Sequence, residues 1–365
     1  MTAGTNAWNI IAGKHVFVTG DMGSRESWVN GIESWQLPET ANAQETCAGA
    51  HWMIYNQIML QWSGEARHAD HIENTLYNDL LAAQDPETGD VTYFLNLTGQ
   101  DKLFDPPPRY GRHCCEGNHM FALGSTPGMI YGRTGEGVAV NLYIPSTLAF
   151  RTASGNQVRL TQETNYPLDG HIAISVECAE PLRLPINLRI PSWCGQAPRL
   201  RVNGKELAAT APPGQWQTVA DEWKSGDRIE LDLPMGPYVL HEYLSNVPRV
   251  ALRWGPLIMA GTWEDGLPLA QDPPIPECAV KSHANRIPYV PSIIMTGSDP
   301  AAAWRATGEA RFEADALVAT VMHASQGGPP EVVRPGSSRV PLRFVPFYEV
   351  TRGKYSIWFP AVVQA

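Results

Sequence analysis

Hydrophobic residues in the first third of the chain recur at helical spacing. Apolar side chains stand three or four positions apart at Ala48, Trp52, Tyr55, Met59 and Trp62. This spacing indicates one face of an amphipathic helix. A second helix is predicted over residues 66–83, before the turn signal Asp85-Pro86, and a third is predicted over residues 116–123. Residues 19–40 show almost no periodicity, and a loop of that length inside a compact region is usually functional or disordered.

Beyond Gly132 the period of the apolar residues changes from helical to two. Runs of this kind include residues 138–144, 172–176, 186–190 and 228–233. Short strands at this spacing, with Asn203-Gly204 as a hairpin turn signal, indicate an antiparallel β-sandwich. Further strands are predicted beyond residue 250. We therefore divide the chain into a helical region at 1–134, a β-sandwich domain at 135–245 and a second β-rich domain at 246–365.

Composition narrows the class of protein. The chain has 365 residues, 43% of them hydrophobic and 18% charged, which is typical of a folded protein with a large core. The net charge of −10 argues against nucleic acid or an anionic membrane as a partner. No apolar run is long enough to span a bilayer, and residues 1–6 do not have the pattern of a signal peptide. Six scattered cysteines do not make a disulfide framework in a chain of this length.

Two of those cysteines, Cys114 and Cys115, are adjacent, and this is the main chemical signal of the sequence. Neighbouring Cα atoms are too close for a relaxed disulfide, whereas two thiolates can bind one soft metal ion. The segment Glu45-Thr46-Cys47 offers further ligands if it lies in the first turn of a helix or in the loop entering it. We therefore predict a tetrahedral zinc site made of one oxygen and three sulfurs, from Glu45, Cys47, Cys114 and Cys115.

These motifs resemble the zinc-dependent β-L-arabinofuranosidases of glycoside hydrolase family 127 and its relatives. The matching pieces include residues 19–24, Leu37-Pro38, Glu45-Thr46-Cys47, Glu73, residues 76–78, Tyr93, Cys114-Cys115, and in the sandwich residues 141–146, 188–193, 202–204 and 254–257. The resemblance implies an α+β multidomain fold, with a partial (α/α)6-barrel helical region followed by antiparallel β-sandwich domains. The family has a set of helices before the Thr19-Gly20 motif, so we expect this chain to be the C-terminal part of such an enzyme. A second chain, another copy or residues before Met1 would then complete the barrel.

The resemblance also implies a retaining glycoside hydrolase with a cysteine nucleophile, which maps to Cys114. Zinc would deprotonate that thiol and fix its direction. The best-known members carry the acid/base glutamate at the position of Val29, and another branch carries it at the position of Glu26. We therefore assign the acid/base role to Glu26, with Glu33 as the alternative. The Glu26 carboxylate is expected about 5–7 Å from the Cys114 sulfur.

Glu73, Tyr93 and His113 are expected to hydrogen-bond sugar hydroxyls or to support the metal ligands. Glu73 could instead pair with a nearby base, His71 or Arg67. The four-ligand site could be a structural zinc in a non-catalytic carbohydrate-binding or scaffold protein, and a redox role for the two cysteines is a third interpretation. Carbohydrate is the expected substrate and zinc the expected cofactor. The compartment stays open, although thiolate ligands favour a reducing one such as the cytoplasm.

Overall fold

The computed structural model describes most of the chain, namely residues 2–23, 44–99, 102, 104, 114–135, 137–242, 249–264, 289–296, 300–322 and 332–364. These residues form two compact units, each assembled from separate stretches of the sequence. Unit 1 comprises Met53–Glu73 and Ala122–Gly236, and unit 2 comprises Thr2–Trp52, Asn74–Phe121 and Pro237–Ala365. The division of the chain into three domains at residues 134 and 245 stays a prediction.

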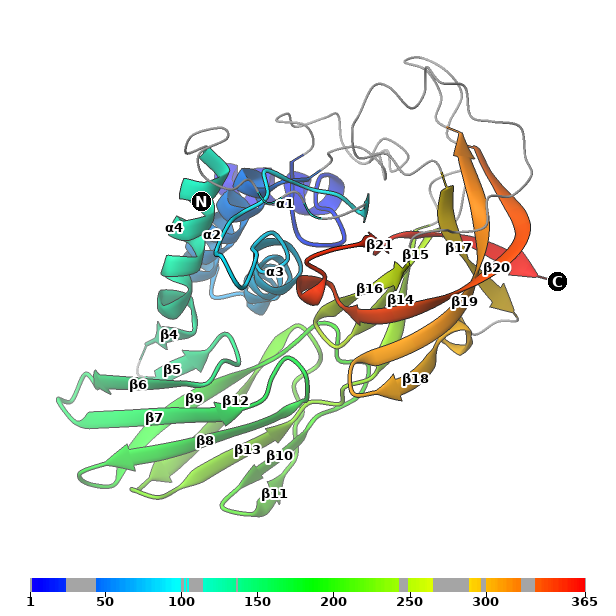
Figure 1. The fold of residues 1–365 in the computed structure, drawn as a ribbon. Coiled ribbons are helices and arrows are strands. Elements are labelled where there is room, and N and C mark those ends of the chain that lie inside the picture. The colour runs from blue at the N-terminus through cyan, green and yellow to red at the C-terminus, as the bar shows by residue number, and fades with distance from the viewer. Residues whose placement is uncertain are drawn as a thin grey trace. The chain divides into compact units, whose positions relative to one another are not determined.

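The helices predicted near residues 48–62, 66–83 and 116–123 are present, with small shifts at their ends, and one further helix precedes them (Figure 1). They are α1 (Thr2–Lys14), α2 (Thr46–Ser63), α3 (Ala66–Thr75) and α4 (Cys114–Ser125). The predicted helix over residues 66–83 continues beyond α3 as a π-helical turn, η2 (Leu76–Leu80), a feature often found near functional sites. In α2, Trp52 and Met59 are buried as expected, whereas Trp62 is 56% exposed. None of the described helices is both long enough and apolar enough to cross a membrane.

Two sheets of unit 1 confirm the expected β-sandwich strands. The six-stranded sheet has the order β11-β10-β13-β8-β7-β6, and the four-stranded sheet has the order β12-β9-β5-β4. Their bounds are β4 (Tyr131–Thr134), β5 (Gly137–Val140), β6 (Ser146–Arg151), β7 (Gln157–Thr164), β8 (His171–Cys178), β9 (Leu182–Ile190), β10 (Arg199–Val202), β11 (Lys205–Leu207), β12 (Gln215–Trp223) and β13 (Arg228–Asp232). Alternate residues of β7 are buried, as a sheet with one covered face requires. Asn203 and Gly204 both have positive φ, as the hairpin turn between β10 and β11 demands.

Unit 2 contains a ten-stranded sheet. Its strands are β3 (Thr98–Gly99), β14 (Pro237–Glu242), β15 (Arg249–Trp254), β16 (Leu257–Trp263), β17 (Tyr289–Thr296), β18 (Arg305–Gly308), β19 (Arg311–Met322), β20 (Val332–Pro346), β21 (Lys354–Ser356) and β22 (Phe359–Gln364). One apolar cluster joins this sheet to the N-terminal segments, with Phe17 and Leu95 packed among Ile258 and Phe347. The mixed helix and strand content agrees with the predicted α+β class, whereas closure of the helices into a barrel stays a prediction.

A side chain of the π-helical turn ties the helical part of unit 2 to its sheet. The Asn78 amide donates a hydrogen bond to the carbonyl of Pro256 at 2.8 Å, and its oxygen accepts one from the backbone N–H of Ile258 at 2.7 Å. Pro256 lies in the turn between β15 and β16, and Ile258 is the second residue of β16. Because Asn78 satisfies two backbone groups at once, it fixes the start of β16 against η2.

Candidate functional site

The segment that carries Glu45 and Cys47 passes from a strand directly into a helix. Glu45 ends β1 (Gln44–Glu45), which pairs with β2 (Phe94–Leu95), and α2 begins at the next residue. Thr46 holds this junction, since its backbone N–H donates to the carbonyl of Tyr93 at 3.1 Å and its hydroxyl donates to the carbonyl of Thr92 at 2.7 Å. Glu45 and Cys47 therefore lie at a helix start, as the sequence predicted.

The adjacent cysteines occupy the first two positions of α4. A helix N-terminus carries unpaired N–H groups and the positive end of the helix dipole, and both stabilise thiolates. Cys47 lies in the first turn of α2, so the starts of two helices supply sulfurs to one place.

The four predicted ligand atoms, from Glu45, Cys47, Cys114 and Cys115, all lie within 4.8 Å of one another. The sulfurs of Cys47 and Cys115 are 3.2 Å apart, and the Cys115 sulfur is 4.0 Å from Glu45 Oε1. Cys47 and Cys115 are buried, whereas Cys114 is exposed. The arrangement therefore encloses two sulfurs and leaves the third open to solvent.

The contact between two of these thiols shifts their pKa values in opposite directions. The hydrogen bond with Cys115 lowers the pKa of Cys47 to about 5, and the same contact, together with burial, raises the pKa of Cys115. Burial also raises the pKa of Cys114. Neighbouring anions disfavour one another, and a cation bonded to all three sulfurs would remove that penalty. Three sulfurs and one carboxylate oxygen are ligands that zinc takes readily, so the residues present fit a metal ion.

Two further side chains touch the sulfurs. The Tyr93 hydroxyl lies 3.8 Å from the Cys114 sulfur, on the exposed side of the cluster. The Asn118 amide donates to the Cys47 sulfur at 3.3 Å. Asn118 was not among the predicted site residues, although its position one turn after the two cysteines on α4 is a usable signal. Glu26, Glu33 and His113 lie outside the described residues, so their roles stay predictions.

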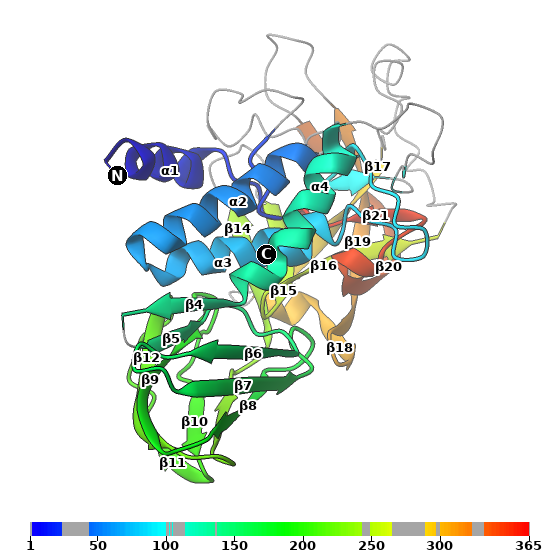
Figure 2. The same ribbon diagram turned by 90° about the vertical axis from the view of Figure 1, so that its left-hand side faces the viewer.

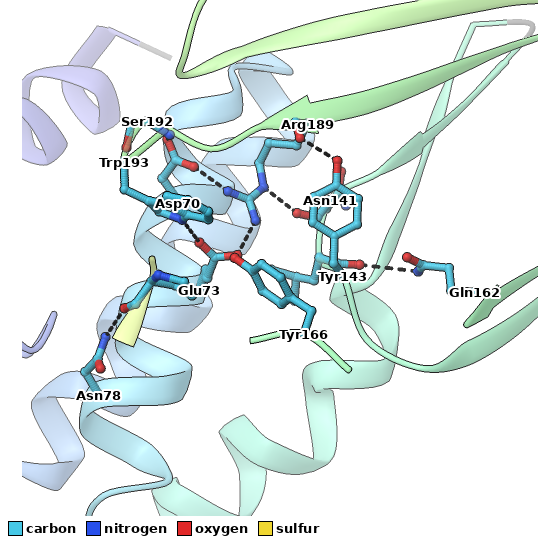
Figure 3. Close-up of polar contacts among 12 residues, drawn as sticks. Asp70, Glu73, Asn78, Asn141, Tyr143, Gln162, Tyr166, Arg189, Ser192 and Trp193 are labelled. Atoms are coloured by element: carbon cyan, nitrogen blue, oxygen red, sulfur yellow. Dashed lines mark hydrogen bonds and ion pairs between the residues drawn. The ribbon is translucent and has the colours of Figure 1, made fainter. Parts of the chain in front are cut away.

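Glu73 is surrounded by protein hydrogen-bond donors in unit 1 (Figure 3). Its Oε1 accepts hydrogen bonds from the Tyr166 hydroxyl, at 2.5 Å, and from the Arg189 guanidinium. Its Oε2 accepts one from the Trp193 indole N–H at 3.2 Å. Glu73 is 2% exposed. These contacts are those of a buried structural carboxylate, and a role in sugar binding remains an expectation of the family resemblance alone.

The base that pairs with Glu73 is neither His71 nor Arg67, which the sequence suggested, but Arg189 from β9. The guanidinium of Arg189 also donates to Asp70 at 2.5 Å and to the carbonyl of Asn141 at 2.6 Å. Asp70 stands one turn before Glu73 on α3, so both carboxylates face the same guanidinium (Figure 3). Glu73 therefore forms an ion pair, as the alternative interpretation predicted, but its partner Arg189 is remote in sequence.

Two buried carboxyl groups in unit 2, those of Asp21 and Asp79, were not among the predicted site residues. Both are fully buried, and neither oxygen of Asp79 has a hydrogen-bond partner among the described residues. Burial, followed by the charge of Asp79, raises the pKa of Asp21 well above 3.8, and burial raises that of Asp79. A Cβ atom at Gly49 would lie 1.7 Å from Asp79 Oδ2, so a glycine inside α2 is the one sequence signal of this close approach.

Comparison with known proteins adds family information to this geometry. Family profiles for the β-L-arabinofuranosidase GH127 catalytic domain and the GH127 middle domain match residues 1–127 and 137–235. The non-reducing end β-L-arabinofuranosidase of Bifidobacterium longum subsp. longum is 26% identical over 366 aligned positions. That alignment covers 93% of this chain and 52% of the relative, so the chain spans about half the length of the curated relative.

Solved structures share the fold. A GH127 β-L-arabinofuranosidase from Geobacillus stearothermophilus T6 has a TM-score of 0.69 at 20% identity, covering 97% of this chain and 56% of that one. A structure described as a GH127 β-arabinofuranosidase has a TM-score of 0.71 at 22% identity, covering 98% and 56%. At these identities the likeness establishes the fold, and the chemistry has to be argued from the residues of the site.

Proposed function

The chain belongs to glycoside hydrolase family 127, and from this premise we propose that it acts in the retaining hydrolysis of β-L-arabinofuranosides or related sugars. Cys114 is the proposed nucleophile and Glu26 the proposed acid/base. The observation that carries the proposal is the exposure of Cys114 in a cluster whose other two sulfurs are buried. One sulfur can therefore meet a substrate while its neighbours stay in place. Because the chain spans about half of its curated relative, the activity is proposed for the protein that contains this chain.

Glu45, Cys47, Cys114 and Cys115 would hold zinc, which supplies the positive charge that keeps the thiols deprotonated and directed. In the first step the Cys114 sulfur attacks the anomeric carbon, and the bond from that carbon to the leaving oxygen breaks. Glu26 gives its proton to the leaving oxygen. In the second step Glu26 takes a proton from water, the water oxygen attacks the anomeric carbon, and the carbon–sulfur bond breaks to return the Cys114 thiolate.

The surrounding residues have supporting roles in this proposal. The Asn118 amide, 3.3 Å from the Cys47 sulfur, stabilises negative charge on a ligand that is not the nucleophile. The Tyr93 hydroxyl, 3.8 Å from the Cys114 sulfur, stands where a sugar hydroxyl would meet the nucleophile. His113 directly precedes α4 in the sequence and is proposed to contact the same sugar.

The second candidate is a non-catalytic, zinc-stabilised carbohydrate-binding or scaffold protein. One observation favours it, because four protein ligands are the usual set of a structural zinc site. The exposure of Cys114 favours catalysis, because a purely structural site gains nothing from an open sulfur.

Replacement of Cys114 by serine in the zinc-loaded protein separates the two candidates. With an aryl β-L-arabinofuranoside as substrate, Cys114→Ser is expected to lower kcat by about a thousandfold or more. Cys178→Ser, at a half-buried cysteine of the sandwich, is the matched control and should leave kcat unchanged. Unchanged turnover in Cys114→Ser excludes the proposed nucleophile.

The acid/base assignment has its own test. Glu26→Gln should slow substrates with poor leaving groups far more than an activated aryl glycoside, whose departure needs little protonation. Equal losses for the two kinds of substrate move the role to Glu33 or away from residues 19–40.

A further inference from the structure

A cavity in unit 1 is lined by residues of α2 and of the four-stranded sheet β12-β9-β5-β4. Figure 2 shows the strands of this sheet side by side. The cavity has a volume of about 750 Å³, within the range of small-molecule sites. All the residues that line it belong to unit 1. It shares no residue with the cluster of Glu45, Cys47, Cys114 and Cys115, which belongs to unit 2.

The floor of this cavity is a row of small and polar residues that crosses the sheet. Thr218 on β12 pairs with Asn187 on β9, Asn187 pairs with Ala139 on β5, and Ala139 pairs with Gly132 on β4. Directly paired positions point to the same face of a sheet. The row therefore ends in a methyl group and a bare Cα, and these small residues leave the sheet surface hollow beneath α2.

Hydrogen bonds hold the polar half of the floor in place. The Thr218 hydroxyl donates to Asn187 Oδ1 at 2.7 Å, and Asn187 Nδ2 donates to the Thr134 hydroxyl at 3.1 Å. Side chains locked in this way lose little conformational entropy when a ligand binds, so the floor is preorganised.

Trp216 supplies an aromatic wall. It lies two residues before Thr218 on β12, and so on the same face of the sheet. Its indole N–H donates to the carbonyl of Gly64 at 2.7 Å, just after the end of α2. Gly64 has φ of +69°, which a glycine adopts readily where a helix ends. The hydrogen bond fixes the half-buried indole and leaves its ring as a surface that lines the cavity.

Two glutamines of α2 supply adjustable polar groups. Gln57 and Gln61 are one turn apart, line the cavity, and make no side-chain hydrogen bond within the part of the chain that the structure describes. Each amide offers both a donor and an acceptor. Among the described residues that line the cavity, none is acidic, and the exposed Arg133 is the one basic residue.

We propose that this cavity binds a neutral sugar unit of an oligosaccharide. A sugar ring has an apolar C–H face that can stack on the Trp216 indole, and its hydroxyls need donors and acceptors in equal measure, as the Gln57 and Gln61 amides provide. A cation would require carboxylates that the lining lacks, and a phosphate would call for several basic groups. The site needs neither Cys114 nor a metal ion, so it goes beyond the proposed hydrolysis.

Filling the cavity tests this proposal. Gly128 lines it from the 3-10 turn η3 (Thr126–Met129), and a Cβ there would meet nothing nearer than Gln57 Nε2 at 4.0 Å. Gly128→Leu should therefore place a side chain in the cavity without backbone strain, with Gly128→Ala as the matched control. The double variant Gln57→Ala/Gln61→Ala removes the amides from the half-exposed face of α2 and provides a second route.

The probes are neutral trisaccharides of L-arabinose, D-xylose and D-galactose, and the trisaccharide of D-galacturonic acid as a charged counterpart. Binding is measured by calorimetry in the Cys114→Ser protein, which cannot turn them over if the proposed nucleophile is correct. At least one neutral trisaccharide should bind, and both Gly128→Leu and the double glutamine variant should weaken that binding by about tenfold or more, with Gly128→Ala unchanged. In the protein that retains Cys114, Gly128→Leu should leave kcat for a monosaccharide aryl glycoside unchanged.

Two results would overturn the proposal. In the first, Gly128→Leu does not weaken the binding of any neutral trisaccharide. In the second, the galacturonic acid trisaccharide binds more tightly than every neutral one. Failure of the proposed hydrolysis is a separate result. It would appear as absent turnover of the aryl glycoside, and it would leave the binding measurements intact.

Discussion

Two clusters of ionisable side chains, one in each unit, differ in how their charge is balanced. In unit 1 the Arg189 guanidinium lies between the carboxylates of Asp70 and Glu73, and all three groups are almost completely enclosed. In unit 2 the clustered ligand groups of Glu45 and the three cysteines are all anionic when ionised. The first cluster contains its own cation, whereas the four residues of the second include none.

The first arrangement suits a structural role, and the second suits the proposed metal site. A buried charge costs several kcal/mol unless it is paired, and a guanidinium built into the chain pairs it permanently. A site that took its cation from solution would keep an exchangeable centre, and the Cys114 sulfur of the second cluster is exposed. Asp21 and Asp79 show a third arrangement, since both are buried without a partner cation in the described part of the chain and burial raises the pKa of each carboxyl group.

The largest expected effect on stability comes from removing the internal cation. Arg189→Met should lower the free energy of unfolding by about 3–5 kcal/mol, because Asp70 and Glu73 would stay buried without a partner charge. Denaturant unfolding measures this loss. Adding Asp70→Asn and Glu73→Gln to Arg189→Met should recover part of it. A loss well below 1 kcal/mol would mean that the cluster does not hold the sandwich to α3.

Chelation is the corresponding test of the second cluster. A ligand that binds the folded state at about a thousand times its Kd adds about 4 kcal/mol of stability, and a strong chelator should remove it. The melting transition of unit 2 should fall, with the sandwich strands of unit 1 less affected, as followed by hydrogen exchange of each unit. Identical melting with and without chelator would mean that Glu45 and the three cysteines hold no metal ion.

The buried carboxyl groups of Asp21 and Asp79 should make stability depend on pH. The folded-state pKa values of Asp21 and Asp79 are raised, so the folded state binds more protons than the unfolded chain once the pH exceeds 3.8. Stability should therefore decline as the pH rises from about 4 towards the folded-state pKa values. The decline is about 1.4 kcal/mol per pH unit for each carboxyl group that is protonated only in the folded state. Asp79→Asn should flatten it in melting curves between pH 4 and 8, and an unchanged slope would contradict the assignment.

The smallest effect is expected at Asn118. Asn118→Ala removes the donor 3.3 Å from the Cys47 sulfur and should weaken zinc binding by about tenfold, measured by competition with a chelating dye. Gly117→Ala is the neighbouring control on α4, since an added methyl group there meets no atom within 4 Å, and it should leave the affinity unchanged. Equal affinities for Asn118→Ala and the control would limit Asn118 to a role in folding.

The sequence by itself was sufficient for the features that depend on near neighbours along the chain. The apolar period predicted α2, and the change of period after Gly132 predicted the strands of the sandwich. The meeting of Glu45, Cys47, Cys114 and Cys115 was also predictable, because adjacent cysteines are chemically unusual and because the Glu45-Thr46-Cys47 segment is short enough to act as one unit. In each case the information lies within a few residues.

The tertiary structure decided which distant residues meet. Arg189 reaches Glu73 across 116 positions, whereas local spacing pointed to His71 or Arg67. Asp21 and Asp79 come together against Gly49, and the cavity beside Trp216 exists because four strands align Thr218, Asn187, Ala139 and Gly132 in one row. Helical and strand periods state which face of an element is buried but not what packs against it, since that depends on the register and packing of segments far apart in the chain.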